Sequence, residues 1–176
     1  SVSAGLLTTP GLAWLTKTED FDLGVMISAS HNPAEDNGVK LFSASGEKLL
    51  DVAEERIEEL LRDQSPAEGL TDSVQLESSL AESYEGHLRE HACPDLDLSG
   101  MRVALDCANG AGSYVAPATL EGLGATVTSI HCAPNGENIN AGCGSTHPGD
   151  LQATVCEGGH DLGVALDGDG DADVLS

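Results

Sequence analysis

Apolar runs of two kinds alternate through the second half of the chain. Three short runs of strand type lie at residues 101–105, 125–130 and 162–166. Two longer stretches with helical spacing separate them, at 113–122 and 149–157. Because parallel strands need a crossover between them, usually a helix, the order βαβαβ predicts a parallel sheet with right-handed crossovers. Ligands of such sheets bind at the carboxyl ends of the strands.

The first half of the chain also mixes strand and helix patterns. Residues 23–27 and 39–42 are strand-like runs, and we expect both strands to be buried. Pro10 suits the start of a short helix before them. A second proline, Pro117, is expected in the first turn of the later helix.

Two further helices are expected on either side of a polar stretch. Residues 51–63 have helical spacing, and Asp51 with Glu54 resembles a capping box. Residues 74–91 form the second expected helix. The apolar stripe of that helix consists of Leu76, Leu80, Tyr84 and Leu88.

The stretch between these two helices, residues 64–73, has the composition of a linker. We therefore expect two consecutive α/β domains, at residues 1–73 and 74–176. Each would have a mixed or mostly parallel sheet flanked by helices.

Charge limits the classes of function that are possible. The chain of 176 residues has 30 acidic and 7 basic side chains, for a formal net charge of −23. Nucleic acids and anionic membranes bind basic patches, so neither is an expected partner. The five cysteines are odd in number and form no C-x-x-C pair, which favours reduced thiols in the cytoplasm. The chain does not begin with Met, and we expect it to be a piece of a longer protein.

Three carboxylates at alternate positions follow the third strand of the βαβαβ unit. Asp167, Asp169 and Asp171 repel one another, and no basic residue lies near them in the sequence. Such oxygen ligands suit Mg²⁺ rather than zinc, and the two intervening glycines let the side chains converge. The alternatives are an EF-hand loop, the D-x-D-G motif of an aspartyl-phosphate phosphatase, or a solvated acidic loop. His87 and His91, four residues apart, are a weaker metal candidate.

Residues 28–33, Ser-Ala-Ser-His-Asn-Pro, form a polar loop between two strand-like runs. Pro33 and the Asn37-Gly38 dipeptide favour tight turns, and Lys40 follows them. The loop presents a hydroxyl, an imidazole and an amide close to an ammonium, groups that nucleophilic catalysis uses. A polar hairpin without chemistry is the alternative.

Together these motifs resemble those of the α-D-phosphohexomutases, in which the serine before His-Asn-Pro is carried as a phosphoserine. Residues 37–40 fit the continuation of the serine motif, and residues 167–171 fit the metal loop of that family. Residues 106–111, 138–140 and 143–148 resemble the branch of bacterial phosphoglucosamine mutases in particular.

The resemblance implies a phosphotransferase that interconverts glucosamine 6-phosphate and glucosamine 1-phosphate through a phosphoserine enzyme and a bisphosphate intermediate. Ser30 would carry the phosphate, and Asn32 would orient the loop. His31 and Lys40 are the candidate proton carriers. The implied ligands of Mg²⁺ are a phosphoserine oxygen of Ser30 and the carboxylates of Asp167, Asp169 and Asp171.

The implied partners are a hexosamine phosphate substrate and a hexose bisphosphate activator. Enzymes of this family have four domains around one cleft, and this chain resembles most of the first two, so we expect no turnover by the chain alone. The family usually has Arg after the third aspartate, where this chain has Ala172. A phosphomannomutase or phosphoglucomutase of the same superfamily and a non-catalytic metal-binding module are the alternatives.

Overall fold

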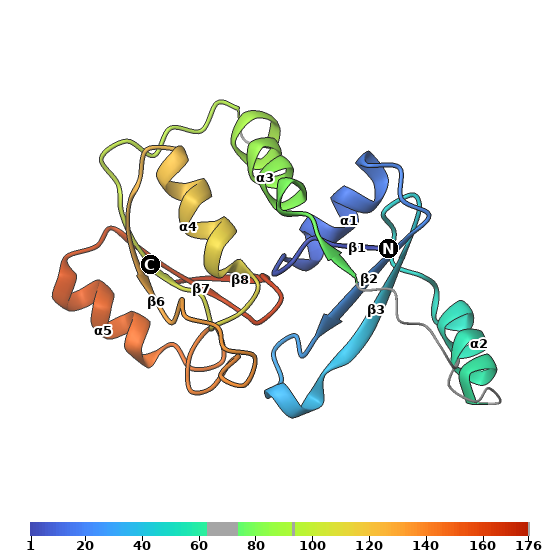
Figure 1. Ribbon diagram of the computed structural model, residues 1–176. Coiled ribbons are helices and arrows are strands. Elements are labelled where there is room, and N and C mark those ends of the chain that lie inside the picture. Colours follow the sequence, from blue (N-terminus) through green and yellow to red (C-terminus); the bar gives the residue numbers. More distant parts are fainter. Residues whose placement is uncertain (63–73, 93, 176) are drawn as a thin grey trace.

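A computed structural model describes residues 1–62, 74–92 and 94–175 (Figure 1). The first elements in chain order are β1 (Val2–Ser3), α1 (Thr9–Thr18), β2 (Leu23–Ser28), a 3₁₀ turn (Ala34–Asp36), β3 (Gly38–Ser43) and α2 (Asp51–Arg62). The elements that follow are β4 (Gln75–Leu76), α3 (Ser78–His87), a π-helical turn (Leu88–Ala92), β5 (Arg102–Asp106), α4 (Gly112–Gly122), β6 (Thr126–Ile130), α5 (Gly149–Gly158), β7 (Leu162–Leu166) and β8 (Ala172–Leu175).

The second half is a sheet of strand order β6-β5-β7-β8 between helical layers (Figure 1). β5 pairs in parallel with β6 and β7, which confirms the predicted βαβαβ unit. Ala104 of β5 packs with Leu151 of α5, while Leu105 packs on the opposite face against Ala116 and Leu120 of α4. β8, antiparallel to β7, was not predicted because its four residues are too few to show a clear period.

The first half contains an antiparallel hairpin of β2 and β3, with α1 packed against β2. The expectation that both strands are buried is wrong, because Val25 and Ile27 of β2 are 52% and 72% exposed and Val39 of β3 is 61% exposed. Alternate residues of a strand point to opposite faces, and here Gly24 lies against Thr16 of α1. The sequence of β2 is apolar on both faces, so its pattern does not show which face is covered.

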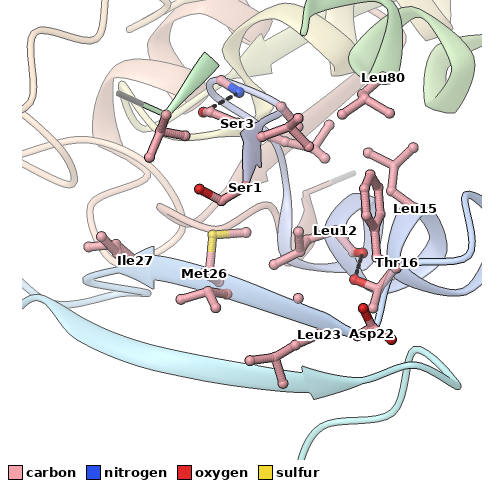
Figure 2. Close-up of a pocket in the computed structure, with 18 residues that line it drawn as sticks. Ser1, Ser3, Leu12, Leu15, Thr16, Asp22, Leu23, Met26, Ile27 and Leu80 are labelled. Carbon is pink, nitrogen blue, oxygen red and sulfur yellow. Dashed lines mark hydrogen bonds between the residues drawn. The ribbon is translucent and has the colours of Figure 1, made fainter. Parts of the chain in front are cut away.

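An apolar groove of ≈ 730 Å³ runs between β1, α1 and β2 (Figure 2). Leu12 and Leu15 of α1 and Met26 of β2 line it. The groove shares no lining residue with the polar loop at 28–40 or the acidic loop at 167–171. It is therefore separate from the site that the sequence motifs predict.

Two helices begin as local chemistry dictates. α1 starts next to Pro10, as predicted, and the Thr8 hydroxyl accepts a hydrogen bond from the Gly11 N–H at 3.3 Å. α3 begins at Ser78 and not at residue 74, because residues 75–76 pair with β1 as strand β4.

Two other helices correct the sequence predictions in detail. α2 has nearly the predicted extent, but the capping box is absent, since Asp51 is its first helical residue and Glu54 pairs with Lys48 at 3.3 Å. Pro117 is the sixth residue of α4 and lies in its second turn, so the prediction of a first-turn proline is wrong. The expected linker at 64–73 lies outside the described residues. Within the described ranges, every helix is too short or too polar to cross a bilayer.

Gly144 occupies a point where two loops meet, and this gives a stability prediction. It has φ +70°, and a Cβ there would lie 2.6 Å from both the Ala108 Cβ and the Leu166 carbonyl oxygen. Gly142 has φ +67° but no atom within 4 Å of its Cβ position. We predict that Gly144→Ala lowers the free energy of unfolding by about 1–3 kcal/mol more than Gly142→Ala, because only the first overpacks. Urea unfolding measures the difference, and equal losses would contradict the prediction.

Candidate active site

The loop after β2 is held from the opposite half of the chain. The Asn140 side-chain amide donates to the carbonyl oxygens of Ser30 and Asn32 at 2.7 and 2.8 Å. The Gly168 N–H also donates to the Ser30 carbonyl, at 3.2 Å. Ser30 itself has φ +52°, an uncommon conformation for a residue other than glycine. Such a conformation persists only where the surroundings impose it, which is the case for this loop.

The acidic loop joins β7 to β8 and is folded around one carboxylate. Oδ1 of Asp167 accepts hydrogen bonds from the backbone N–H groups of Asp169, Gly170 and Asp171 at 3.2, 3.0 and 2.9 Å. Carboxylate oxygens of the three aspartates lie within 4.8 Å of one another, as the sequence spacing predicts. Because two strands flank the loop, it is not an EF-hand, in which helices flank the loop.

Three distant segments meet at these aspartates. The Ser30 hydroxyl lies 3.5 Å from Oδ2 of Asp167, and the Thr9 hydroxyl donates to Oδ2 of Asp169 at 3.1 Å. Lys40 of β3 forms an ion pair with the same oxygen of Asp169. The expectation that the aspartates have no basic neighbour is therefore wrong. The sequence could not predict this ion pair, because its two residues are 129 positions apart.

The two buried aspartates have opposite pKa shifts. Asp167 and Asp169 are only 6% and 2% exposed. Burial, together with the hydrogen bond and charge of Asp169, raises the pKa of Asp167. Burial also acts to raise the pKa of Asp169, but the hydrogen bonds from Lys40 and with Asp167 outweigh it and lower that pKa.

The cluster has the chemistry of a site for a hard cation. Within the described ranges, three carboxylates face one paired ammonium, that of Lys40. Oδ1 of Asp169 is buried and has no hydrogen-bond partner among the described residues. A buried carboxylate oxygen without a partner is costly unless a cation binds it. The all-oxygen donor set fits Mg²⁺.

The remaining predicted residues lie around this cluster. His31 and Asn32 are exposed in the loop beside Ser30. Thr9, which donates to Asp169, and Asn140, which donates to the Ser30 carbonyl, were missed as site residues. Asn140 lies in the 138–140 motif that carries part of the family resemblance, so the sequence did point to it. Nothing in the sequence pointed to Thr9 except its place beside the predicted start of a helix.

Among the described residues, no third ligand joins His87 and His91 to make a group that could hold a metal. The rings of His87 and His91 stack 5.7 Å apart, and His87 stacks on Trp14 at 4.5 Å. These contacts give the rings a packing role beside α1.

Comparison with known proteins decides the family. The model for the phosphoglucomutase/phosphomannomutase alpha/beta/alpha domain I matches residues 1–68, and the domain II model matches residues 82–175. The chain belongs to this family of phosphohexomutases. It is 47% identical to the phosphoglucosamine mutases of Deinococcus deserti and Moorella thermoacetica over 97% of its own length.

The chain spans 39% of the length of those two relatives. Its fold also matches a phosphoglucomutase/phosphomannomutase family protein from Burkholderia thailandensis, with a TM-score of 0.75 at 22% identity. That match covers 99% of this chain and 40% of the other. The expected fold of two α/β domains is thus confirmed, while the boundary between residues 73 and 74 stays a prediction.

The raised pKa of Asp167 gives a prediction about the stability of the chain. Ionisation of a group with a raised folded-state pKa destabilises the fold as the pH rises above the unfolded pKa of about 3.9. Asp167→Asn keeps an acceptor oxygen and removes the charge. We predict that, without metal, Asp167→Asn is more stable than the parent at pH 7, and that the difference disappears as the pH falls to about 3.

Urea unfolding with a chelator at several pH values measures this difference. Asp20→Asn, at an exposed carboxylate after α1, is the control and should change little. A parent that is the more stable protein at pH 7 would contradict the account of Asp167.

Proposed function

We propose that residues 1–73 and 74–176 are the first two domains of a phosphoglucosamine mutase, which interconverts glucosamine 6-phosphate and glucosamine 1-phosphate. The observation that carries the proposal is the 3.5 Å approach of the Ser30 hydroxyl to Asp167, beside the other two aspartates. The names of the 47% identical relatives favour an amino sugar over the mannose or glucose phosphates of the wider family.

The chemistry begins with a phosphoryl group on Oγ of Ser30. Its P–Oγ bond breaks while a bond forms to one hydroxyl oxygen of the sugar phosphate, which becomes a bisphosphate, and the hydroxyl proton passes to a base. After the bisphosphate reorients in the site, its other phosphoryl group is transferred to Oγ of Ser30. The sugar oxygen that loses this group takes up a proton. Such transfer depends mainly on positioning and on neutralising charge.

Two groups beside Ser30 are suited to move these protons. His31 follows Ser30 directly, and its exposed imidazole can take a proton from a bound sugar. Lys40, as the ammonium paired with Asp169, can give a proton but cannot take one. Asn32 helps to hold the loop, since its carbonyl oxygen accepts the Asn140 amide.

Mg²⁺ would be held by a phosphoserine oxygen and by Asp167, Asp169 and Asp171. It would neutralise charge, because a phosphate of about −2 beside three carboxylates is otherwise disfavoured. The unpartnered Oδ1 of Asp169 supports this ligand set. A hexosamine phosphate is the proposed substrate, a hexose bisphosphate the activator, and the cytoplasm the proposed location.

Phosphorylation of Ser30 tests the proposal. After prolonged incubation with a hexose 1,6-bisphosphate, peptide mass spectrometry should find one phosphate on Ser30. Ser30→Ala should carry none, whereas Ser28→Ala should keep it, since the Ser28 hydroxyl only accepts the Ser30 N–H at 2.9 Å. Phosphate on Ser28, phosphate retained in Ser30→Ala, or no phosphate at all would contradict the proposal.

Magnesium binding should depend on Asp169. We predict that Asp169→Asn weakens Mg²⁺ binding at least tenfold in titration calorimetry, because even residues that only support a ligand are worth about 10–100-fold. The exposed Asp20→Asn is the matched control and should bind as the parent does. Unchanged affinity in Asp169→Asn would argue for a solvated acidic loop without a metal.

The 176-residue chain should not complete the reaction alone. Its 7 basic residues leave few cations for the second phosphate of the intermediate, and Lys40 is the one that pairs within the site described above. Positioning of that kind can be worth roughly 7–11 kcal/mol of barrier. A coupled assay for glucosamine 1-phosphate should read background for the chain, even when Ser30 is phosphorylated and Mg²⁺ is present. Turnover at the rate of a full-length relative would show that the two domains suffice.

A further inference from the structure

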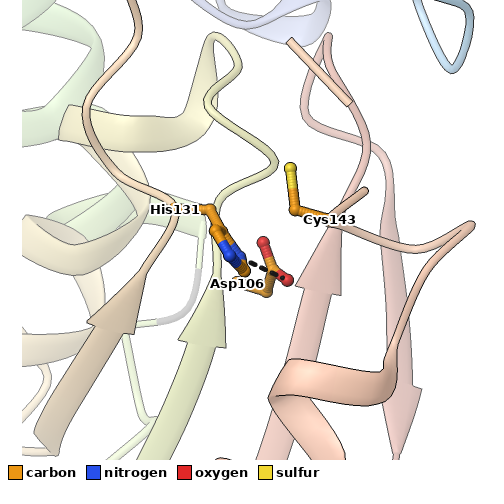
Figure 3. Close-up of side chains that lie close together, drawn as sticks. All are labelled: Asp106, His131 and Cys143. Carbon is orange, nitrogen blue, oxygen red and sulfur yellow. Dashed lines mark hydrogen bonds and ion pairs between the residues drawn. The ribbon is translucent and has the colours of Figure 1, made fainter. Parts of the chain in front are cut away.

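A second group of possible metal ligands lies at the same edge of the sheet, outside the Ser30 site. Asp106 ends β5, His131 directly follows β6, and Cys143 lies in the loop before α5 (Figure 3). One ligand atom of each lies within 4.8 Å of those of the other two. Asp106 and Cys143 are fully buried, while the His131 side chain is 27% exposed to solvent.

The carboxylate and the imidazole are both held in orientation by outer contacts. Asp106 accepts the backbone N–H of Ala108 on Oδ1 at 2.9 Å and that of Gly144 on Oδ2 at 3.0 Å. Nδ1 of His131 lies 3.0 Å from Oδ2 of Asp106. Its other nitrogen, Nε2, lies 3.3 Å from a carboxylate oxygen of Asp150. A carboxylate on the far nitrogen of a histidine is the usual outer partner of a metal-binding imidazole.

The sulfur is also placed by a polar neighbour. The Asn109 side-chain amide lies 3.7 Å from Sγ of Cys143 and points a donor at it. Burial, then the charge of Asp106, raises the pKa of Cys143 to about 11. The sulfur is therefore a neutral thiol near pH 7 until a metal displaces its proton.

We propose that Asp106, His131 and Cys143 bind one Zn²⁺ ion, with water as the fourth ligand. Sulfur, imidazole nitrogen and carboxylate oxygen together are a donor set for zinc, unlike the all-oxygen set of the acidic loop. Tetrahedral bonds of about 2.0–2.3 Å put ligand atoms roughly 3.3–3.8 Å apart. The three ligand atoms here already lie within 4.8 Å of one another. The thiol proton leaves to solvent when the sulfur binds.

The ion would join three loops that otherwise meet through hydrogen bonds. Those loops follow β5, follow β6 and precede α5. Asn140, which holds the Ser30 carbonyl, lies between His131 and Cys143 in the chain. Zinc at this position therefore stabilises the segment that supports the phosphoserine loop, without contacting substrate.

Cobalt substitution tests the site on the 176-residue chain. One equivalent of Co²⁺ added to the reduced protein should produce a thiolate-to-cobalt charge-transfer band and tetrahedral d–d bands, and Zn²⁺ should abolish both. Cys143→Ser should lose the charge-transfer band, while Cys156→Ser, at an exposed thiol on α5, should keep it. His131→Gln, which keeps the thiol and alters a partly exposed side chain, should weaken Co²⁺ binding at least tenfold.

Two controls separate this site from others. Asp169→Asn should keep the band, because the acidic loop offers no sulfur. Circular dichroism of each variant checks that it is folded. Absence of the band in the parent, its survival in Cys143→Ser, or unchanged affinity in a folded His131→Gln would overturn the proposal.

Discussion

The site depends on one contact between the two halves of the chain, in which the loop after β2 meets the loop between β7 and β8. Gly168 and Asn140 donate to the Ser30 carbonyl, and the Thr9 N–H donates to the Asp169 carbonyl at 3.1 Å. The donors are backbone N–H groups and one side-chain amide, and the acceptors are backbone carbonyls. These bonds therefore hold the loops together whether or not the aspartates are ionised. The Ser30 hydroxyl is thereby presented to Asp167 in a conformation that an isolated hairpin would not keep.

Charge explains why such a site needs a cation. Two of the three aspartates are buried, and the single ammonium of Lys40 can satisfy only one of them. The two aspartates therefore have opposite pKa shifts. Burial raises the pKa of Asp167, whereas for Asp169 the contact with Lys40 outweighs burial and lowers the pKa. In a chain of net charge −23 no surplus of basic residues can make up the deficit. In the proposed reaction a divalent ion would do so, and it would leave Lys40 available as an acid.

Local sequence patterns predicted the secondary structure of the second half and the acidic loop. The parallel βαβαβ unit follows from apolar periodicity, and the gathering of Asp167, Asp169 and Asp171 follows from their spacing. Periodicity could not show that β2 is exposed on one face, because that strand is apolar on both faces. It could not show that β8 exists, because four residues are too few for a clear period. The pairing of Lys40 with Asp169 lies beyond any local signal. The link between Ser30 and the acidic loop was implied only by family resemblance, since 137 positions separate the hydroxyl from Asp167.

The central claim is that one ion bridges a phosphate on Ser30 and the aspartates of the acidic loop. Electron–nuclear double resonance of Mn²⁺, in place of Mg²⁺, measures this directly through coupling to phosphorus. The chain phosphorylated on Ser30 should show a ³¹P coupling that is absent from the unphosphorylated chain. Mn²⁺ that binds the acidic loop of the phosphorylated chain without any ³¹P coupling would contradict the claim.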